Sequence, residues 1–132
     1  MKITALIAAM VMSGLAPVVS SVAESLAFPG AEGFGRLTSG GNDGTVVHVT
    51  NLNDAGPGSF RDAVSQSNRL VLFDVSGVIR FQSNVAVSSQ LTLDGQTAPG
   101  GGVALYGRST SFSGGHDCIV RYLRFREGIN GD

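Results

Sequence analysis

The feature that most constrains the fold is a series of short apolar segments, each rich in β-branched or aromatic residues and each closed by turn-forming residues. The chain carries 19 glycines in 132 residues, twice the usual share of about 7%, so it must turn often. Such segments predict strands at 45–50, 70–75, 78–81, 85–87, 91–93, 103–106 and 119–125. We therefore expect an all-β fold.

The spacing of these segments favours a solenoid. The longest apolar stretches begin at Val71, Leu91 and Ile119, at steps of 20 and 28 residues. Steps of this length are typical of stacked coils with loops of variable length, and they predict about three coils. A β-sandwich is the alternative, but it favours tight hairpins between equal strands. The Asp94-Gly95 pair is followed by further loop-forming residues and does not join two strands directly.

One short helix is expected at 59–64. Ser59 is suited to the N-cap, and Asp62 lies three residues further on, where a capping box places an acid. Phe60 and Val64 lie on one face of this segment. An amphipathic helix at this position can cover the first coil, whose interior side chains have no preceding neighbour.

Residues 1–23 have the organisation of a secretory signal peptide. Lys2 gives a positive start, an apolar core follows at 3–15, and small residues end at Ala23. An uncleaved membrane anchor is the alternative, but a core of 13 residues is shorter than the roughly 20 that a spanning helix needs. We expect residues 24–132 to be the mature domain, secreted to an extracellular or periplasmic space and without membrane contact.

Charge and cysteine content exclude other classes. The formal net charge is −1 and no basic block occurs, so binding to nucleic acid is not expected. The single cysteine, Cys118, cannot form an internal disulfide. Its neighbour His116 suggests a nucleophile–base pair, but Cys118 opens an apolar strand. We interpret Cys118 as a buried thiol and His116 as a turn residue.

Six segments, in this order along the chain, resemble the amino-terminal third of secreted pectate lyases. They are AFPGAEGFG at 27–35, HVTNL at 48–52, GPGSFRDA at 56–63, FDVSG at 73–77, GQTAPG at 95–100 and IVRYLRFR at 119–126. The resemblance covers the chain from Ala27 to about Gly128. It implies a right-handed parallel β-helix, capped by the 59–64 helix and incomplete at its carboxy end.

The resemblance also implies an activity. Pectate lyases cleave α-1,4-linked polygalacturonate by β-elimination, with calcium held by carboxylates and a basic side chain, usually arginine, taking the C5 proton. A hard cation binds oxygen ligands and withdraws charge from the uronate carboxylate, which acidifies the neighbouring C–H. In the family these groups follow the 119–126 strand, so we expect the catalytic residues beyond residue 132 and no lyase activity from this polypeptide alone.

Three residues near the carboxy end are candidates for the site. Asp132 stands where the first calcium-binding loop of the family begins and is a candidate calcium ligand, although an Asn-Gly-Asp turn is the alternative. Arg121, Arg124 and Arg126 form a basic row on the last predicted strand. Alternation turns Leu123 inward, so Arg124 and Arg126 point outward together. They are candidate contacts for the carboxylates of an acidic polysaccharide, or else a solvated strand face.

A second class of function fits the same pattern. A non-catalytic β-helical module could bind or adhere to a polygalacturonate-like polymer through the same wall. A further expectation concerns the last predicted strand, which ends within seven residues of the terminus. An uncovered apolar strand edge pairs readily with another chain, so we expect the polypeptide to self-associate there.

Overall fold

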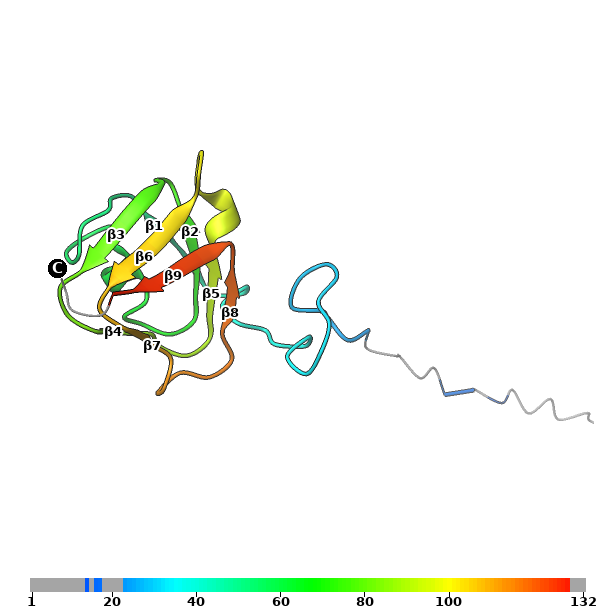
Figure 1. Cartoon of the computed structure of the whole chain (residues 1–132). Coiled ribbons are helices and arrows are strands. Elements are labelled where there is room, and N and C mark those ends of the chain that lie inside the picture. The colour runs from blue at the N-terminus through cyan, green and yellow to red at the C-terminus, as the bar shows by residue number, and fades with distance from the viewer. Residues whose placement is uncertain (1–13, 15, 18–22, 129–132) are drawn as a thin grey trace, which may run out of the picture.

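The computed structural model describes residues 14, 16–17 and 23–128 of the chain. Within this part every strand pairing is parallel, and the strands form three sheets on different sides of one common interior (Figure 1). The expected parallel β-solenoid is confirmed, and the β-sandwich alternative is wrong. Sheet A contains β1 (Thr45–Val49), β2 (Arg69–Phe73), β5 (Leu91–Asp94) and β8 (Ile119–Arg121); sheet B contains β3 (Gly77–Phe81), β6 (Val103–Gly107) and β9 (Leu123–Glu127); sheet C contains β4 (Val85–Ala86) and β7 (Thr110–Ser111).

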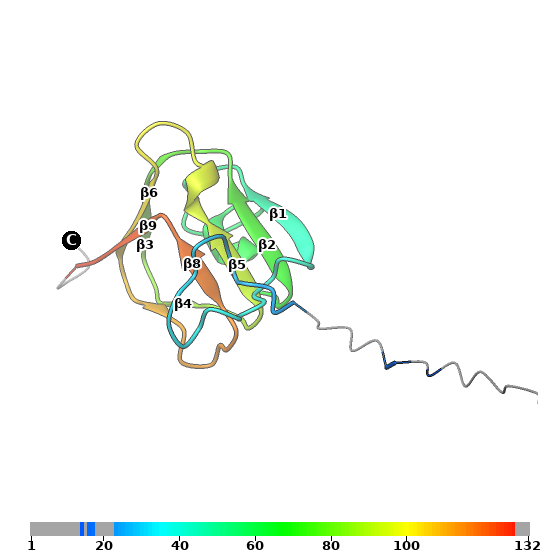
Figure 2. The same ribbon diagram turned by 90° about the vertical axis from the view of Figure 1, so that its right-hand side faces the viewer.

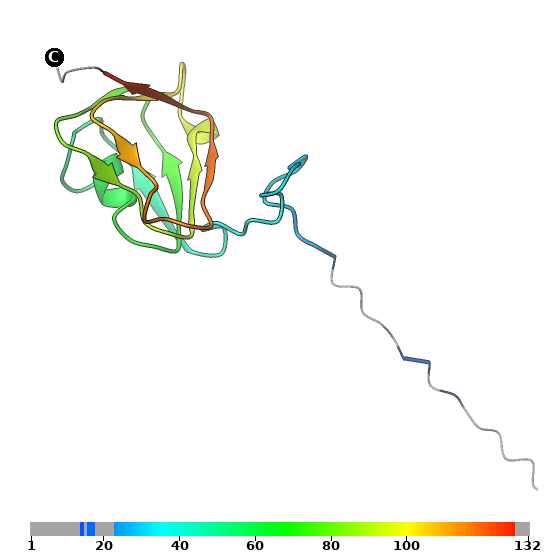
Figure 3. The ribbon, with the colours of Figure 1, turned by 60° about the horizontal axis from the view of Figure 1, so that its bottom comes forward.

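The interior of the solenoid is filled by aligned rows of apolar side chains. In sheet A, where the strands stand side by side (Figure 3), Val71 is paired in register with Leu93, and both are fully buried. In sheet B, Ile79 is paired with Leu105, and both are buried. Because alternate residues of a strand face opposite sides, the same registers place the intervening residues, such as Leu70, Thr92 and Arg80, on the outer faces.

The short helix covers the amino-terminal end of the interior. Helix α1 (Phe60–Ala63) begins at Ser59, whose side chain accepts a hydrogen bond from the backbone N–H of Asp62, as the capping pattern predicts. Phe60 is fully buried, with its ring 6.3 Å from that of Phe73 and 5.8 Å from that of Phe81. Among the residues that the structure describes, sheets B and C have no strand at the level of β1, and α1 closes the interior there.

The amino-terminal segment, residues 24–44, crosses the outer face of sheet A over β5 and β8 (Figure 2). The backbone N–H of Gly41 donates to the Thr92 hydroxyl at 3.0 Å, and that hydroxyl donates to the Asn42 side chain at 2.7 Å. The Ser39 hydroxyl donates to the Asp117 carboxylate at 2.8 Å. These bonds fix a loop onto a sheet face that the sequence pattern alone left open.

The predicted strand at 119–125 is wrong as a single element. It is divided into β8 and β9 at Tyr122, which has a φ of 56° and turns the chain from sheet A to sheet B. The side-chain alternation therefore restarts after Tyr122. Ile119 lies on the outer face of sheet A under Gly40, whereas Leu123 packs against the interior. A further departure is the short 3-10 helix η1 (Gly95–Thr97), where the sequence indicates only loop.

Most of the expected signal peptide at 1–23 lies outside the described residues. In the described part of the chain, no helix is long and apolar enough to cross a membrane. The boundaries of the leader and of the mature domain stay predictions.

Candidate functional site

Arg124 and Arg126 project from the outer face of β9. Leu123 and Phe125 pack against the interior, whereas Arg124 and Arg126, which alternate with them, are exposed. This is the alternation that the sequence predicts for the segment. The structure thus places both candidate residues on one surface, the outer face of sheet B.

Register brings two further residues onto the same face. Arg80 of β3 is paired with Tyr106 of β6, and Tyr106 is paired with Arg126 of β9. The guanidinium carbon of Arg80 lies 4.9 Å from the centre of the Tyr106 ring, within the range of a cation–π contact. We call this face the sheet B wall; its outward positions are Val78, Arg80, Ala104, Tyr106, Arg124 and Arg126.

The sheet B wall carries positive charge without matching carboxylates. Within the described residues, Arg80, Arg124 and Arg126 make no ion pair. Glu127, at the end of β9, accepts a hydrogen bond from the backbone N–H of Thr110 at 3.2 Å. The three guanidinium groups are therefore available to an external anion.

Two backbone contacts orient the arginines of β9. Arg124 donates from Nη2 to the carbonyl of Gly101 at 2.6 Å. It also lines an open hollow of about 360 Å³ between the η1 loop and the start of β9, together with Gly100, Gly102 and Tyr122. Arg126 donates from Nη1 to its neighbour's carbonyl, that of Phe125, at 3.1 Å. Each guanidinium keeps further N–H donors for a ligand.

The predicted basic row of three arginines is wrong in one member. Arg121 belongs to β8 in sheet A, because the chain turns at Tyr122. Its guanidinium carbon lies 4.3 Å from the centre of the Phe28 ring and 5.1 Å from that of Tyr122. Arg121 therefore holds the amino-terminal segment against sheet A and does not share the sheet B wall.

The other candidate reactive groups have structural partners. Cys118 is partly buried, and its thiol lies 3.4 Å from the Ser88 carbonyl and 3.5 Å from the backbone carbonyl of His116. The contact with His116 is to its main chain, which does not support a nucleophile–base pair. On the outer face of sheet A, His48 Nδ1 lies 2.7 Å from an Asp74 carboxylate oxygen, and both side chains are about half exposed.

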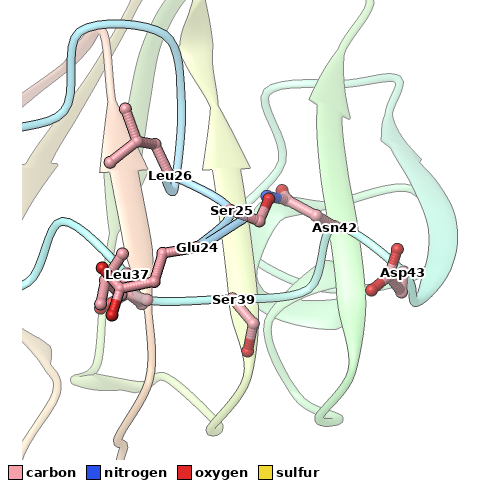
Figure 4. A pocket seen from close by; sticks show the side chains of 8 residues that line it. Glu24, Ser25, Leu26, Leu37, Ser39, Asn42 and Asp43 are labelled. Carbon is pink, nitrogen blue, oxygen red and sulfur yellow. The ribbon is translucent and has the colours of Figure 1, made fainter. Parts of the chain in front are cut away.

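Among residues 14, 16–17 and 23–128, no three His, Cys, Asp or Glu side chains come together as a metal site. Asp132, the candidate calcium ligand, lies outside the described residues. A second hollow of about 370 Å³ lies within the amino-terminal segment (Figure 4). Its lining includes Ser39 and Asn42, whose side chains bond to Asp117 and to the Ala27 carbonyl.

The fold places the chain among the parallel β-helix proteins. Comparison with known proteins narrows this class. The chain is 52% identical over 118 residues to a probable pectate lyase C of Emericella nidulans, an alignment that covers 89% of the chain and 28% of that protein. A probable pectate lyase C of Aspergillus oryzae is 56% identical over 106 residues, covering 80% of the chain and 25% of that protein.

A more distant relative agrees. A probable pectate lyase 6 of Arabidopsis thaliana is 35% identical over 72 residues, covering 50% of the chain and 16% of that protein. A scan against models of protein families finds no match. Over most of its length the chain is therefore similar to part of proteins named as probable pectate lyases. It spans little more than a quarter of the length of the fungal relatives it matches.

Sequence reasoning named Arg124 and Arg126 as candidates and did not name Arg80 and Tyr106, which share their face. Both missed residues occupy outward positions in alternating segments, which the sequence does indicate. Their alignment with Arg126 depends on the strand register, which in turn depends on two loops of unequal length. A basic or aromatic residue at each outward position of successive coils is the signal that could have identified them.

Proposed function

We propose that this chain functions in a secreted pectate lyase that cleaves polygalacturonate by calcium-dependent β-elimination. The observation that carries the proposal is the 50–56% identity to fungal proteins named as probable pectate lyases. The unpaired arginines of the sheet B wall support the choice of an acidic polymer, because guanidinium groups bind carboxylates in a bidentate geometry.

The proposal for calcium rests on the chemistry of the substrate. Uronate carboxylates are hard oxygen ligands, which calcium prefers. Asp132 is the residue of this sequence that we propose as a ligand. No step of the reaction is assigned to the described residues, among which no three His, Cys, Asp or Glu side chains come together.

The test of the lyase proposal is the ultraviolet absorbance of the unsaturated product. The secreted gene product is incubated with polygalacturonate, with calcium or with a chelator. We expect product with calcium and none with the chelator, and more product from the acidic polymer than from its methyl ester. Absence of product under all conditions would contradict the proposal.

We also propose that the polypeptide of residues 24–132 has no lyase activity by itself. Elimination requires the base, the metal and the acidic polymer to be held together in one geometry. The family resemblance expects the base and most metal ligands beyond residue 132. Turnover of polygalacturonate by the purified polypeptide would overturn this proposal and would direct attention to its arginines.

A second candidate function is non-catalytic binding of an acidic polysaccharide. The sheet B wall favours it, since Arg80, Arg124 and Arg126 are exposed and unpaired within the described residues. The two functions differ in one measurement. A binding module retains the polymer and releases no unsaturated product, whereas a lyase releases product.

We further propose that the polypeptide of residues 24–132 self-associates through the coil formed by β8 and β9. These strands each pair on one side, with β5 and β6. Between them opens a hollow of about 360 Å³ whose lining includes Phe112, Val120 and Phe125. A second copy that pairs with these edges would satisfy main-chain donors and bury this apolar surface. Light scattering over a range of protein concentrations tests the proposal.

A further inference from the structure

We propose that the sheet B wall is a docking surface for one chain of an acidic polysaccharide, which crosses the strands over Arg80, Tyr106 and Arg126 with Arg124 beside it. The choice of polysaccharide rests on the proposed function. The surface itself rests on the geometry of three successive coils.

The three aligned residues form a line across the strands. Arg80, Tyr106 and Arg126 occupy equivalent positions of β3, β6 and β9. Figure 1 shows these three strands side by side. Neighbouring strands are about 4.8 Å apart, so the two arginines stand roughly 10 Å apart with Tyr106 between them. A polyuronate presents carboxylates at regular intervals along its length. Two guanidinium groups held at a fixed separation by a rigid sheet can bind two carboxylates of such a polymer at once.

Tyr106 supplies a polar group between the two charges. Its ring is partly buried and lies beneath the Arg80 guanidinium. Its hydroxyl points toward Gly128 and makes no hydrogen bond within the described residues. A free phenol hydroxyl can donate to or accept from a sugar hydroxyl. Tyr106 thus adds a contact that a simple electrostatic patch lacks.

Arg124 extends the surface to one side. It is paired with Ala104 of β6, a small residue that leaves space above the sheet. Its bond to the Gly101 carbonyl places the guanidinium at the edge of the open hollow beside the η1 loop. A carboxylate of the polymer at this edge would meet a fixed donor group.

The same wall is a poor surface for nucleic acid. Proteins that bind duplexes strongly commonly make roughly 6–10 phosphate contacts. The wall offers three arginines, and the formal net charge of the whole chain is −1. A few aligned cations with an interposed hydroxyl suit a single carbohydrate strand, where charge and sugar hydroxyls are both recognised.

The experiment measures binding of a fluorescent polygalacturonate oligomer to the full chain by anisotropy. The variants are Arg126→Gln, the triple variant Arg80→Gln, Arg124→Gln, Arg126→Gln, and Tyr106→Phe. Arg36→Gln is the matched control, because Arg36 is an exposed arginine of the amino-terminal segment, away from the wall. Circular dichroism of each variant checks that the fold is kept.

We expect Arg126→Gln to weaken binding severalfold and the triple variant to weaken it by about tenfold or more, as for partly solvated charge pairs. Arg36→Gln should leave the dissociation constant unchanged. The parent chain should bind the methyl-esterified oligomer no more tightly than the triple variant binds the acidic oligomer. Tyr106→Phe should weaken binding by about threefold, the effect of one exposed hydrogen bond.

Several results would overturn the inference. They are no binding by the parent chain, triple-variant binding within twofold of the parent, equal binding of the methyl ester, and equal binding of duplex DNA at the same salt concentration. The lyase assay is read separately. Product without binding at the wall would contradict the docking surface and leave the lyase function standing. Binding at the wall without product would contradict the lyase function and leave the docking surface standing.

Discussion

The first and the last described coils contain the same kinds of side chain in different surroundings. In sheet A the inward row runs from Val71 and Leu93, both fully buried, to Val120, which is 37% exposed. In sheet B, Ile79 and Leu105 are buried, and Phe125, next in the row, is half-buried. The exposure of the side chains thus rises along both rows, although every side chain in them is apolar.

The difference lies in what covers each end. At the amino-terminal end, α1 inserts Phe60 against Phe73 and Phe81 and closes the interior. In the last described coil, β8 and β9 are each hydrogen-bonded to a strand along one edge, and Phe112 and Phe125 border an open hollow. Burial in a solenoid therefore depends on the neighbouring coil or cap more than on the side chain itself.

The largest expected effect comes from removing the cap's aromatic side chain. Phe60→Ala should lower the free energy of unfolding by about 3–5 kcal/mol, because it deletes a fully buried ring and leaves a cavity. Phe125→Ala, at the open end, should cost about 1–2 kcal/mol, since its ring is already partly hydrated. Urea denaturation measures both, with the fully exposed Phe34→Ala as control. Equal losses for Phe60→Ala and Phe125→Ala would contradict the comparison.

A smaller effect is expected where the amino-terminal segment covers the last coil. A Cβ at Gly41 would overlap the backbone carbonyl of Arg69, and the adjacent Gly40 covers Ile119 of β8. Gly41→Ala should therefore displace the segment and destabilise the fold by about 1–3 kcal/mol. Gly101→Ala is the matched control, because its Cβ meets no atom within 4 Å. A loss no greater than that of the control would show that the segment is not held on sheet A.

The N-cap of α1 should contribute less than its buried ring. Ser59→Ala removes the hydroxyl that accepts from the Asp62 N–H, and it should cost about 1 kcal/mol. Ser67→Ala, an exposed serine beyond the helix, should change stability little. Thermal melts of the two variants, recorded under one set of conditions, make the comparison. If the two variants have the same melting temperature, the Ser59 hydrogen bond does not contribute to stability, and the packing of Phe60 alone holds α1 in place.

The smallest effect on stability is expected at the open end. Tyr122 is 60% exposed and has a φ of 56°, a conformation that asparagine adopts more readily. Tyr122→Asn should leave the free energy of unfolding within about 0.5 kcal/mol of the parent. It should nevertheless reduce self-association, because it removes an exposed ring beside the β8 and β9 edges. Light scattering that shows unchanged association would exclude this ring from the contact.

The parts of this fold that could be predicted are those with local signals. β-branched runs predict the strands, and Ser59 with Asp62 predicts the cap, because both depend on residues close in sequence. The break at Tyr122 could not be predicted, since tyrosine carries no signal for a positive φ. The bond between Ser39 and Asp117 joins residues 78 positions apart, and no local pattern encodes it.

The candidate site shows the same limit. Alternation in β9 predicts that Arg124 and Arg126 face outward together, and they do. The expectation that Arg121 belongs to the same row is wrong, because the chain turns at Tyr122 and Arg121 lies in sheet A. Arg80 and Tyr106 join the wall through register, which is set by packing between coils. Asp132 lies outside the described residues, and its role stays a prediction.

The central claim is that α1 closes the first described coil, whereas β8 and β9 each have one strand edge without a partner among the described residues. Hydrogen exchange on the polypeptide of residues 24–132, at several protein concentrations, tests it most directly. We predict slow, concentration-independent exchange in β2 and around α1, and faster exchange in β8 and β9 that slows as concentration rises. Exchange in β8 and β9 as slow as in β2 at the lowest concentration would contradict the account, because it would mean that the last coil is closed within a single chain.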